Sequence, residues 1–295
     1  MTSISSPPVP SGESVLIAGC GYVGCALGVA LAGEGVDVWG VRREESRLPS
    51  EIRGIGCDLM DPVAVGSLPR SFASLVFCLS AGGSGTLSSY RAVYVDTFRR
   101  LLDHGDFQRV IFVSSTGVYG QRSGEWVDET SETRPAIDSG KAMLEAEALA
   151  LAGDREHIIV RFSGIYGPGR TRLVRRVEQR RAICVSGRPR FLNQIHRDDC
   201  AGVLQHLLSI QNPEKLYLAT DSEPEDLATV CGWISERAGL PPPEMVPADD
   251  PRVEEDRRGN KRCRNVRLLE SGYRFQYPSF REGYAGLVPR RGEIR

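Results

Sequence analysis

A glycine-rich turn between an apolar run and a helical pattern is the feature that most constrains this chain. Residues 19–24 read GCGYVG, which is a G-x-G-x-x-G spacing. The preceding residues 15–18 are continuously apolar, as is typical of a parallel strand buried on both faces. Small and aliphatic residues over 23–32 predict a helix that ends at Gly33. The sequence therefore predicts a strand, a tight turn and a helix in direct succession.

Each glycine of this turn has a physical role in a dinucleotide site. Gly19 permits the tight turn, Gly21 removes a side chain where a diphosphate approaches, and Gly24 lets the helix pack closely on the strand. The helix beginning at Tyr22 and Val23 presents N–H groups and a positive dipole end to the anion. The alternative is a glycine-rich turn without a ligand, but the repeated βα units that follow favour dinucleotide binding.

Strands and helices continue to alternate along the chain. Each right-handed crossover places its helix over a parallel sheet, so the pattern predicts an α/β fold of the Rossmann type, a doubly wound parallel sheet. The predicted elements are strands at 36–41, 75–79, 110–113 and 158–160, and helices at 88–102 and 136–151.

The composition of the sequence changes after Phe162, where Gly, Pro and Arg become frequent. We expect a smaller C-terminal substrate lobe to begin there, with helices near 171–181, 198–208 and 224–238. The predicted organisation is a disordered lead-in at 1–13, an NAD(P)-binding Rossmann domain at 14–165 that a strand within 195–220 would complete, and a substrate-binding lobe at 166–295.

The end of the second predicted strand bears on the choice of cofactor. An acidic residue is expected there in an NAD site, whereas Arg42 and Arg43 stand there in this chain and would neutralise a 2'-phosphate. Asp37 comes too early for the acidic role. NADP is therefore preferred, with NAD as the alternative. Asp58, after the third strand, is placed either to accept a hydrogen bond from adenine or to cap the next turn.

Composition excludes several classes of partner and site. The net charge of -1 favours neither nucleic acid nor an anionic membrane surface. The eight cysteines form no C-x-x-C pair and have no histidine at zinc-ligand spacing, so we expect reduced thiols and no metal site. No apolar run is long enough to cross a bilayer, and the first residues are a poor secretion signal, which predicts a cytoplasmic protein.

Further motifs carry a resemblance to a known family. They are LSAGGSG at 79–85, VIFVSSTGVYG at 110–120, RFSGIYGPGR at 161–170 and NQIHRDD at 193–199. Together with the glycine turn they make the chain resemble the extended and atypical short-chain dehydrogenase/reductases, often called the NAD-dependent epimerase/dehydratase family. The resemblance covers most of the chain. It implies cofactor contacts at Leu79, Ser80 and Ala81, a small-molecule substrate, and a homodimer as in many relatives.

The resemblance also implies catalytic roles. Ser115 matches the residue that hydrogen-bonds the reacting oxygen, and Lys141 matches the lysine that holds the nicotinamide ribose. Thr116 and Gly117 stand where family dehydratases carry an acid pair, which argues against dehydration. The resemblance also places Thr116 and Tyr119 beside Ser115 as substrate-binding candidates. Arg170 and Arg175 are further candidates, because arginines in the lobe suit an anionic ligand.

The family's acid/base tyrosine is missing. Its position, one helical turn before the lysine, is occupied by Ile137. Asp138 is a surrogate candidate, as are Tyr119, Tyr166 and His196. The leading hypothesis is an NAD(P)-dependent oxidoreductase or epimerase-like enzyme acting on a carbonyl or alcohol carbon of a small, anionic or sugar-like substrate. The alternative is a non-catalytic NADP-binding sensor or partner-binding protein.

Overall fold

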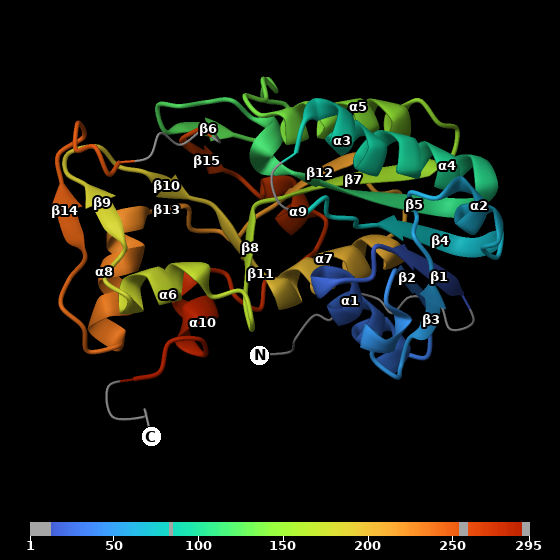
Figure 1. The fold of residues 1–295 in the computed structure, drawn as a ribbon, viewed down its shortest axis with the longest axis horizontal. Helices are drawn as coiled ribbons and strands as arrows, with labels where there is room; N and C mark the ends of the chain where they lie inside the picture. The colour runs from blue at the N-terminus through green and yellow to red at the C-terminus, as the bar shows by residue number, and fades with distance from the viewer. Residues whose placement is uncertain (1–12, 83–84, 254–258, 291–295) are drawn as a thin grey trace.

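The central element of the protein is a seven-stranded parallel sheet (Figure 1). The structure is a computed structural model that describes residues 13–82, 85–253 and 259–290, so the expected lead-in falls almost wholly outside the described residues. The strand order is β12-β7-β5-β4-β1-β2-β3, and it confirms the predicted doubly wound α/β class. The strands are β1 (Ser14–Ala18), β2 (Asp37–Arg42), β3 (Arg53–Gly56), β4 (Ser71–Phe77), β5 (Asp106–Ser115), β7 (Glu156–Phe162) and β12 (Leu216–Ala219).

The strand order reverses between β1 and β4. From β1 the chain builds outward to β2 and β3, and from β4 it builds in the opposite direction through β5 and β7 to β12. In open α/β sheets the crevice beyond the carboxyl ends of the strands at such a reversal is where ligands bind. The topology therefore places the candidate site at the ends of β1 and β4.

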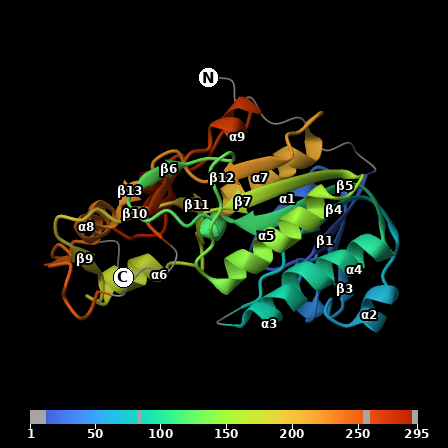
Figure 2. The same ribbon diagram turned by 90° about the horizontal axis from the view of Figure 1, so that it is seen from above.

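Helices cover both faces of the sheet (Figure 1). One face carries α1 (Tyr22–Gly33) and α7 (Arg197–Ser209), which contact each other. Figure 2 shows α4 and α5 running alongside each other over the other face. The elements of that face are α2 (Pro62–Gly66), α3 (Leu87–Arg91), α4 (Thr97–His104) and α5 (Asp138–Leu151).

The second lobe lies beyond the carboxyl end of β7, because β8 (Gly164–Tyr166) continues from that strand and pairs with β11 (Gln194–His196). Figure 1 shows the lobe at one end of the sheet. Its helices α6 (Arg172–Glu178), α8 (Leu227–Arg237) and α10 (Phe280–Ala285) share a buried apolar cluster. Its short strands are β9 (Ile183–Val185), β14 (Glu244–Val246), β10 (Phe191–Leu192) and β13 (Glu225–Asp226). Strand β6 (Glu125–Val127) pairs with β15 (Lys261–Cys263), and α9 (Val266–Glu270) contacts the edge strand β12.

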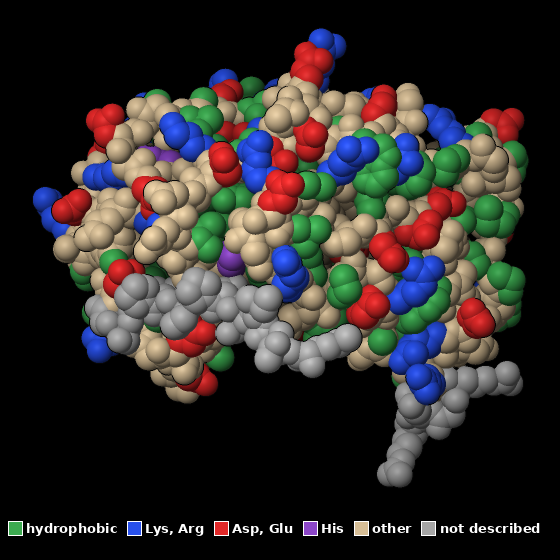
Figure 3. All heavy atoms as spheres, turned by 180° about the vertical axis from the view of Figure 1, so that it is seen from behind, with side chains coloured by type: hydrophobic (Ala, Val, Ile, Leu, Met, Phe, Trp, Pro, Cys, Tyr) green, Lys and Arg blue, Asp and Glu red, His purple; other side chains and the backbone are tan. Residues whose placement is uncertain are grey.

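The described surface is electrostatically mixed. On the face in Figure 3, basic and acidic side chains are interspersed, in agreement with the net charge of -1. Among the helices of the described residues, none combines the length and the apolar character that crossing a membrane requires.

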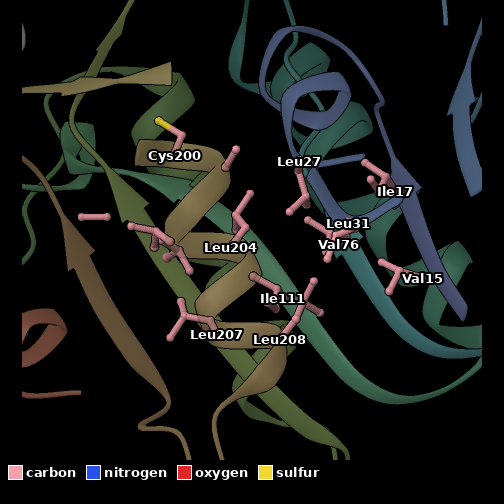
Figure 4. Packing of buried hydrophobic residues seen from close by; sticks show 14 of the residues in the cluster. Val15, Ile17, Leu27, Leu31, Val76, Ile111, Cys200, Leu204, Leu207 and Leu208 are labelled. Carbon is pink, nitrogen blue, oxygen red and sulfur yellow. The ribbon is translucent and has the colours of Figure 1, made fainter. Parts of the chain in front are cut away.

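The core explains why the strands are continuously apolar rather than alternating. In β1, Ile17 faces Leu27 of α1 and the α7 side of the sheet, where Leu204 also packs (Figure 4). The next residue back, Leu16, faces the opposite cluster, which contains Phe98 of α4. Successive side chains of a strand point to opposite faces, and here both faces are covered by helices.

Candidate cofactor and active site

A cavity of about 520 Å³ opens at the carboxyl ends of β1 to β5 and β7. Ligand pockets commonly measure roughly 300–1,000 Å³. Its wall contains the glycine turn after β1, Arg42 and Arg43 after β2, Asp58 after β3, residues 79–81 after β4, and Ser115 at the end of β5. Residues that are remote in the sequence thus meet at the sheet edge that the strand order indicates.

The glycine turn is closely packed on one side and open on the other. Gly19 has φ +85°, and a Cβ there would lie 2.8 Å from the Cα of Leu79. At Gly24 a Cβ would come within 3.0 Å of Ile17 Cγ2, which confirms how closely the helix approaches the strand. At Gly21 the nearest atom would be 3.7 Å away. A side chain at Gly21 would therefore enter open space at the cavity wall, where a diphosphate fits.

Tyr22 joins the glycine turn to the second lobe. Its hydroxyl donates to the Pro168 carbonyl oxygen at 2.8 Å. The guanidinium carbon of Arg170 lies 4.2 Å from the centre of the Tyr22 ring, and that of Arg197 lies 5.4 Å away, both within cation–π range. Tyr22, Val23 and Arg170 all line the cavity. The arrangement brings a positive charge of the lobe to the beginning of α1.

The end of β2 presents a cluster of charged side chains to the cavity. Arg42 donates to the carbonyl oxygen of Arg47 at 3.3 Å, and Arg43 lines the wall beside it. Glu44 and Arg47 also line the wall and form a salt bridge of 2.7 Å. Sequence reasoning stopped at Arg43 and missed these last two residues, although they belong to the same charged run.

Asp58 fulfils one of its two predicted roles within the chain itself. Its Oδ1 accepts the backbone N–H of Met60 at 3.0 Å, so the carboxylate caps the turn after β3. Asp58 also lines the cavity. The two roles are compatible, because a carboxylate has a second oxygen that can accept from a ligand.

A π-helical turn brings an unpredicted aromatic residue to the site. The sequence predicts one helix at 88–102, whereas the structure has α3, a π-helical segment (Ala92–Asp96) and α4. Val93 and Tyr94 of this segment line the cavity, and the Tyr94 hydroxyl accepts the N–H of Ala81 at 3.1 Å. The wider π turn shifts which side chains face the sheet, so 3.6-residue periodicity misses them.

Three serines lie together where β5 and β7 end. The Ser115 hydroxyl accepts the N–H of Gly117 at 3.1 Å, and the Ser114 hydroxyl donates to Glu147 Oε1 at 2.6 Å. Ser163 is 6% exposed, and its hydroxyl has no hydrogen-bond partner among the described residues. All three serines line the cavity, so the orphaned Ser163 hydroxyl is available to a ligand. The sequence identified only Ser115.

Two predicted substrate contacts, Thr116 and Tyr119, do not line the cavity. Both are buried. The Tyr119 hydroxyl donates to the Asp128 carbonyl oxygen at 2.6 Å and accepts from Arg161 at 2.8 Å, and burial raises the pKa of Tyr119. Arg161 in turn forms a buried ion pair with Glu147 at 2.6 Å. Tyr119 is therefore part of an internal polar cluster away from the cavity wall, and its assignment as a substrate contact stays a prediction.

Lys141 and Asp138 also lie outside the cavity wall. Helix α5 begins at Asp138 with Ile137 as its N-cap residue, two residues later than predicted. The Lys141 ammonium lies 2.9 Å from Asp138 Oδ1, and their side chains are 49% and 41% exposed. Residues three apart share a helix face, so the two charges pair with each other. Arg175 is likewise exposed on α6 and does not line the cavity.

The remaining acid/base candidates are packed inside the lobe. Tyr166 and His196 are 4% and 3% exposed, and their rings are 5.4 Å apart. Burial lowers the pKa of His196. Neither residue lines the cavity. The four acid/base candidates and Lys141 thus lie away from the cavity wall, whereas residues 19–23 of the glycine turn line it.

Comparisons with known proteins agree with this architecture. The sequence model of the NAD dependent epimerase/dehydratase family matches residues 15–197. Protein YeeZ of Escherichia coli is 26% identical over 282 residues, covering 90% of this chain and 97% of YeeZ. A solved structure from Methylobacillus flagellatus with the same family name is 37% identical, with a TM-score of 0.77 and coverage of 94% and 98%. The human epimerase family protein SDR39U1, solved with NADPH, shares the fold at 18% identity and a TM-score of 0.73, with coverage of 93% and 99%.

Proposed function

Because the chain belongs to the NAD-dependent epimerase/dehydratase family, we propose that it is an enzyme that uses NADP to oxidise or reduce a carbon bearing oxygen. The observation that supports this most is that one cavity contains the glycine turn, the arginines after β2 and Ser115. The first two features suit the diphosphate and the adenosine phosphate, and the third suits a reacting oxygen. The cofactor and the reacting carbon of the substrate would thus lie in one continuous cavity.

The cofactor would lie along the sheet edge. Backbone N–H groups at the start of α1 have no intrahelical acceptor and would hold the diphosphate. Arg42, Arg43 and Arg47 would hold a 2'-phosphate. Their three positive charges exceed the single negative charge of Glu44, with which Arg47 forms a salt bridge. Similar solved structures include SDR39U1 with NADPH and MoeE5 with NAD, so the preference for NADP rests on the arginines. When bound, the nicotinamide ring would supply or accept hydride.

The substrate would lie beside the serines. Ser115 would donate a hydrogen bond to the reacting oxygen, and the unpartnered hydroxyl of Ser163 would bind either the substrate or the cofactor amide. Arg170 at the wall favours a small anionic or phosphorylated, sugar-like substrate. Dehydration is not proposed, because Thr116 and Gly117 supply no acid for a leaving hydroxyl.

One observation favours a second candidate function, a non-catalytic NADP-binding sensor. Ile137 stands at the tyrosine position, and none of Tyr119, Tyr166, His196, Asp138 and Lys141 lines the cavity. A proton would then have to come from water or from the substrate. A protein that lost the acid/base residue would still bind the cofactor at the glycine turn but would no longer turn over a substrate.

A substrate screen separates the two functions. Purified protein is incubated with NADPH or NADP and a panel of aldehydes, ketones and sugar nucleotides while the absorbance of the reduced cofactor is followed. Turnover above the protein-free rate with any compound supports the enzyme hypothesis. Tight cofactor binding without turnover of any compound supports the sensor hypothesis.

The missing tyrosine gives a sharper version of this test. Ile137→Tyr is expected to raise turnover by about 10² if the remaining site is assembled, because a positioned acid/base contributes on that scale. Ile137→Phe is the matched control, since it adds the ring without the hydroxyl. Equal rates for the two variants would contradict a proton-transfer role at this position.

A further inference from the structure

Two thiols lie at the base of the glycine turn. Cys20 is the second residue of the turn and lines the cavity, and Cys25 follows in the first part of α1. Their Sγ atoms are 3.9 Å apart. The backbone N–H of Cys25 donates to Gly21 at 2.8 Å, so the helix itself holds the second thiol close to the turn.

The two thiols differ in reactivity. Cys25 is partly exposed, whereas Cys20 is fully buried by protein atoms. A hydrogen bond from Cys20 and the nearby charge of Arg42 lower the pKa of Cys25 to about 7, while the same hydrogen bond and burial raise the pKa of Cys20. A thiol with a pKa near 7 is substantially thiolate at neutral pH and is the form that reacts with oxidants. Burial raises the pKa of the neighbouring Cys78, so this thiol stays protonated and reacts more slowly with an oxidant than Cys25 does.

We propose that Cys20 and Cys25 form an oxidative modification site, a dithiol that a hydroperoxide closes into a disulfide and that thereby weakens cofactor binding. The Cys25 thiolate attacks the peroxide, takes one oxygen to become a sulfenic acid, and releases hydroxide, which combines with the proton that the Cys25 thiol gave up on ionising to form the first water. Cys20, after losing its proton, attacks the Cys25 sulfur and displaces the oxygen as water. Two thiols and one hydrogen peroxide thus give one disulfide and two waters.

Closing the disulfide must displace part of the turn. The sulfur atoms have to approach to about 2.05 Å, roughly half of their present separation. Cys20 has little room to rotate, because its side chain is fully buried and its Sγ packs against the backbone of Gly40, where an added Cβ would lie 2.9 Å from it. The backbone of residues 19–21 or the start of α1 has to shift, and these are the groups that would hold the diphosphate. This step rests on the proposed cofactor site.

The coupling is reciprocal. If the disulfide lowers the affinity for NADPH, then bound NADPH must disfavour the disulfide by the same factor. We expect a change of about tenfold in each direction, which lies in the usual range for coupled sites. Cofactor-loaded protein is therefore expected to require more oxidant for half-maximal disulfide formation than free protein.

Mass spectrometry tests the disulfide directly. Both thiols lie within the single tryptic fragment 1–42, which has no internal Lys or Arg. The full-length protein is treated with hydrogen peroxide, its remaining thiols are blocked with an alkylating reagent, and it is digested. The fragment is expected to lack both alkyl groups and to weigh two hydrogens less than the fully reduced fragment.

Variants and a binding measurement complete the test. Cys25→Ser is expected to bind NADPH as the reduced wild-type protein does and to keep that affinity after peroxide. Cys78→Ser should still form the lighter fragment, which excludes Cys78 as the partner of Cys25. Peroxide-treated wild-type protein should bind NADPH about tenfold more weakly, and a thiol reductant should restore binding.

Two results would overturn the inference. One is a fragment that stays fully alkylatable after peroxide, and the other is a closed disulfide that leaves the NADPH affinity unchanged. Absence of any dinucleotide binding by the reduced protein would instead overturn the proposed function, and the mass of the fragment would still decide whether the two thiols form a disulfide.

Discussion

Helices α1 and α5 both begin near the carboxyl edge of the sheet, yet their first turns differ in what they offer a ligand. The start of α1 presents the glycine turn to the cavity. The start of α5 presents an exposed Asp138–Lys141 pair that lies outside the cavity wall, next to Ile137 in the tyrosine position. The end of the cavity that we propose for the cofactor is thus lined by the glycine turn, whereas the proposed catalytic end has Ile137 where the family resemblance places a tyrosine.

The difference shows that binding and catalysis depend on different kinds of residue. Holding a diphosphate requires backbone N–H groups and three positions without side chains, which the packing at Gly19 and Gly24 makes hard to replace. Proton transfer requires one side chain at one place, and a single substitution removes it. A chain of this family can therefore keep its nucleotide site after its original chemistry has changed.

The largest expected effect concerns the buried ion pair behind the catalytic end. Arg161→Met leaves Glu147 buried without its partner and is expected to lower the free energy of unfolding by about 3–5 kcal/mol. Urea denaturation followed by circular dichroism measures it. The control is Arg134→Met, whose pair with Glu132 is exposed and should contribute at most about 1 kcal/mol. Equal losses in the two variants would show that the buried cluster does not stabilise this end.

The second prediction concerns the cofactor end. A leucine at Gly21 would project into the open space at the wall, so Gly21→Leu should weaken NADPH binding by about 100-fold through loss of charged hydrogen bonds. Its melting temperature should stay close to that of the wild-type protein, because a Cβ there meets no close neighbour. Unchanged affinity in a folded variant would contradict the assignment of the diphosphate to this turn.

The smallest predicted effect concerns the choice between the two cofactors. Arg43→Ala should reduce the preference for NADPH over NADH by about tenfold, because one charged contact to the 2'-phosphate is lost. Competition binding with the two reduced cofactors measures the ratio. Arg172→Ala, which removes an exposed arginine outside the cavity wall, should leave the ratio unchanged. A preference that survives Arg43→Ala would assign the discrimination to Arg42 or Arg47.

The sequence was informative where structure depends on neighbours along the chain. The apolar run before Gly19 and the glycine spacing predicted a strand, a turn and a helix, and these elements form as β1 and α1. The alternation of strands and helices predicted the parallel sheet, because crossover handedness leaves few other arrangements.

It was less informative where a side chain's environment is set by remote residues. Tyr119 is buried, and its hydroxyl accepts a hydrogen bond from Arg161, 42 residues away. Tyr94 reaches the cavity only because of a π-helical turn that regular helical periodicity does not reveal. Ser163 follows a strand whose end lies next to Ser115 only after the sheet is assembled, since Ser115 pairs with Phe162.

Calorimetric titration of the reduced wild-type protein with NADPH, NADP, NADH and NAD tests the central claim most directly. We predict a one-to-one complex with micromolar affinity for NADPH and weaker binding of NADH, both abolished or strongly reduced in Gly21→Leu. Absence of heat for all four dinucleotides at millimolar concentration, with folded protein in the cell, would contradict the account.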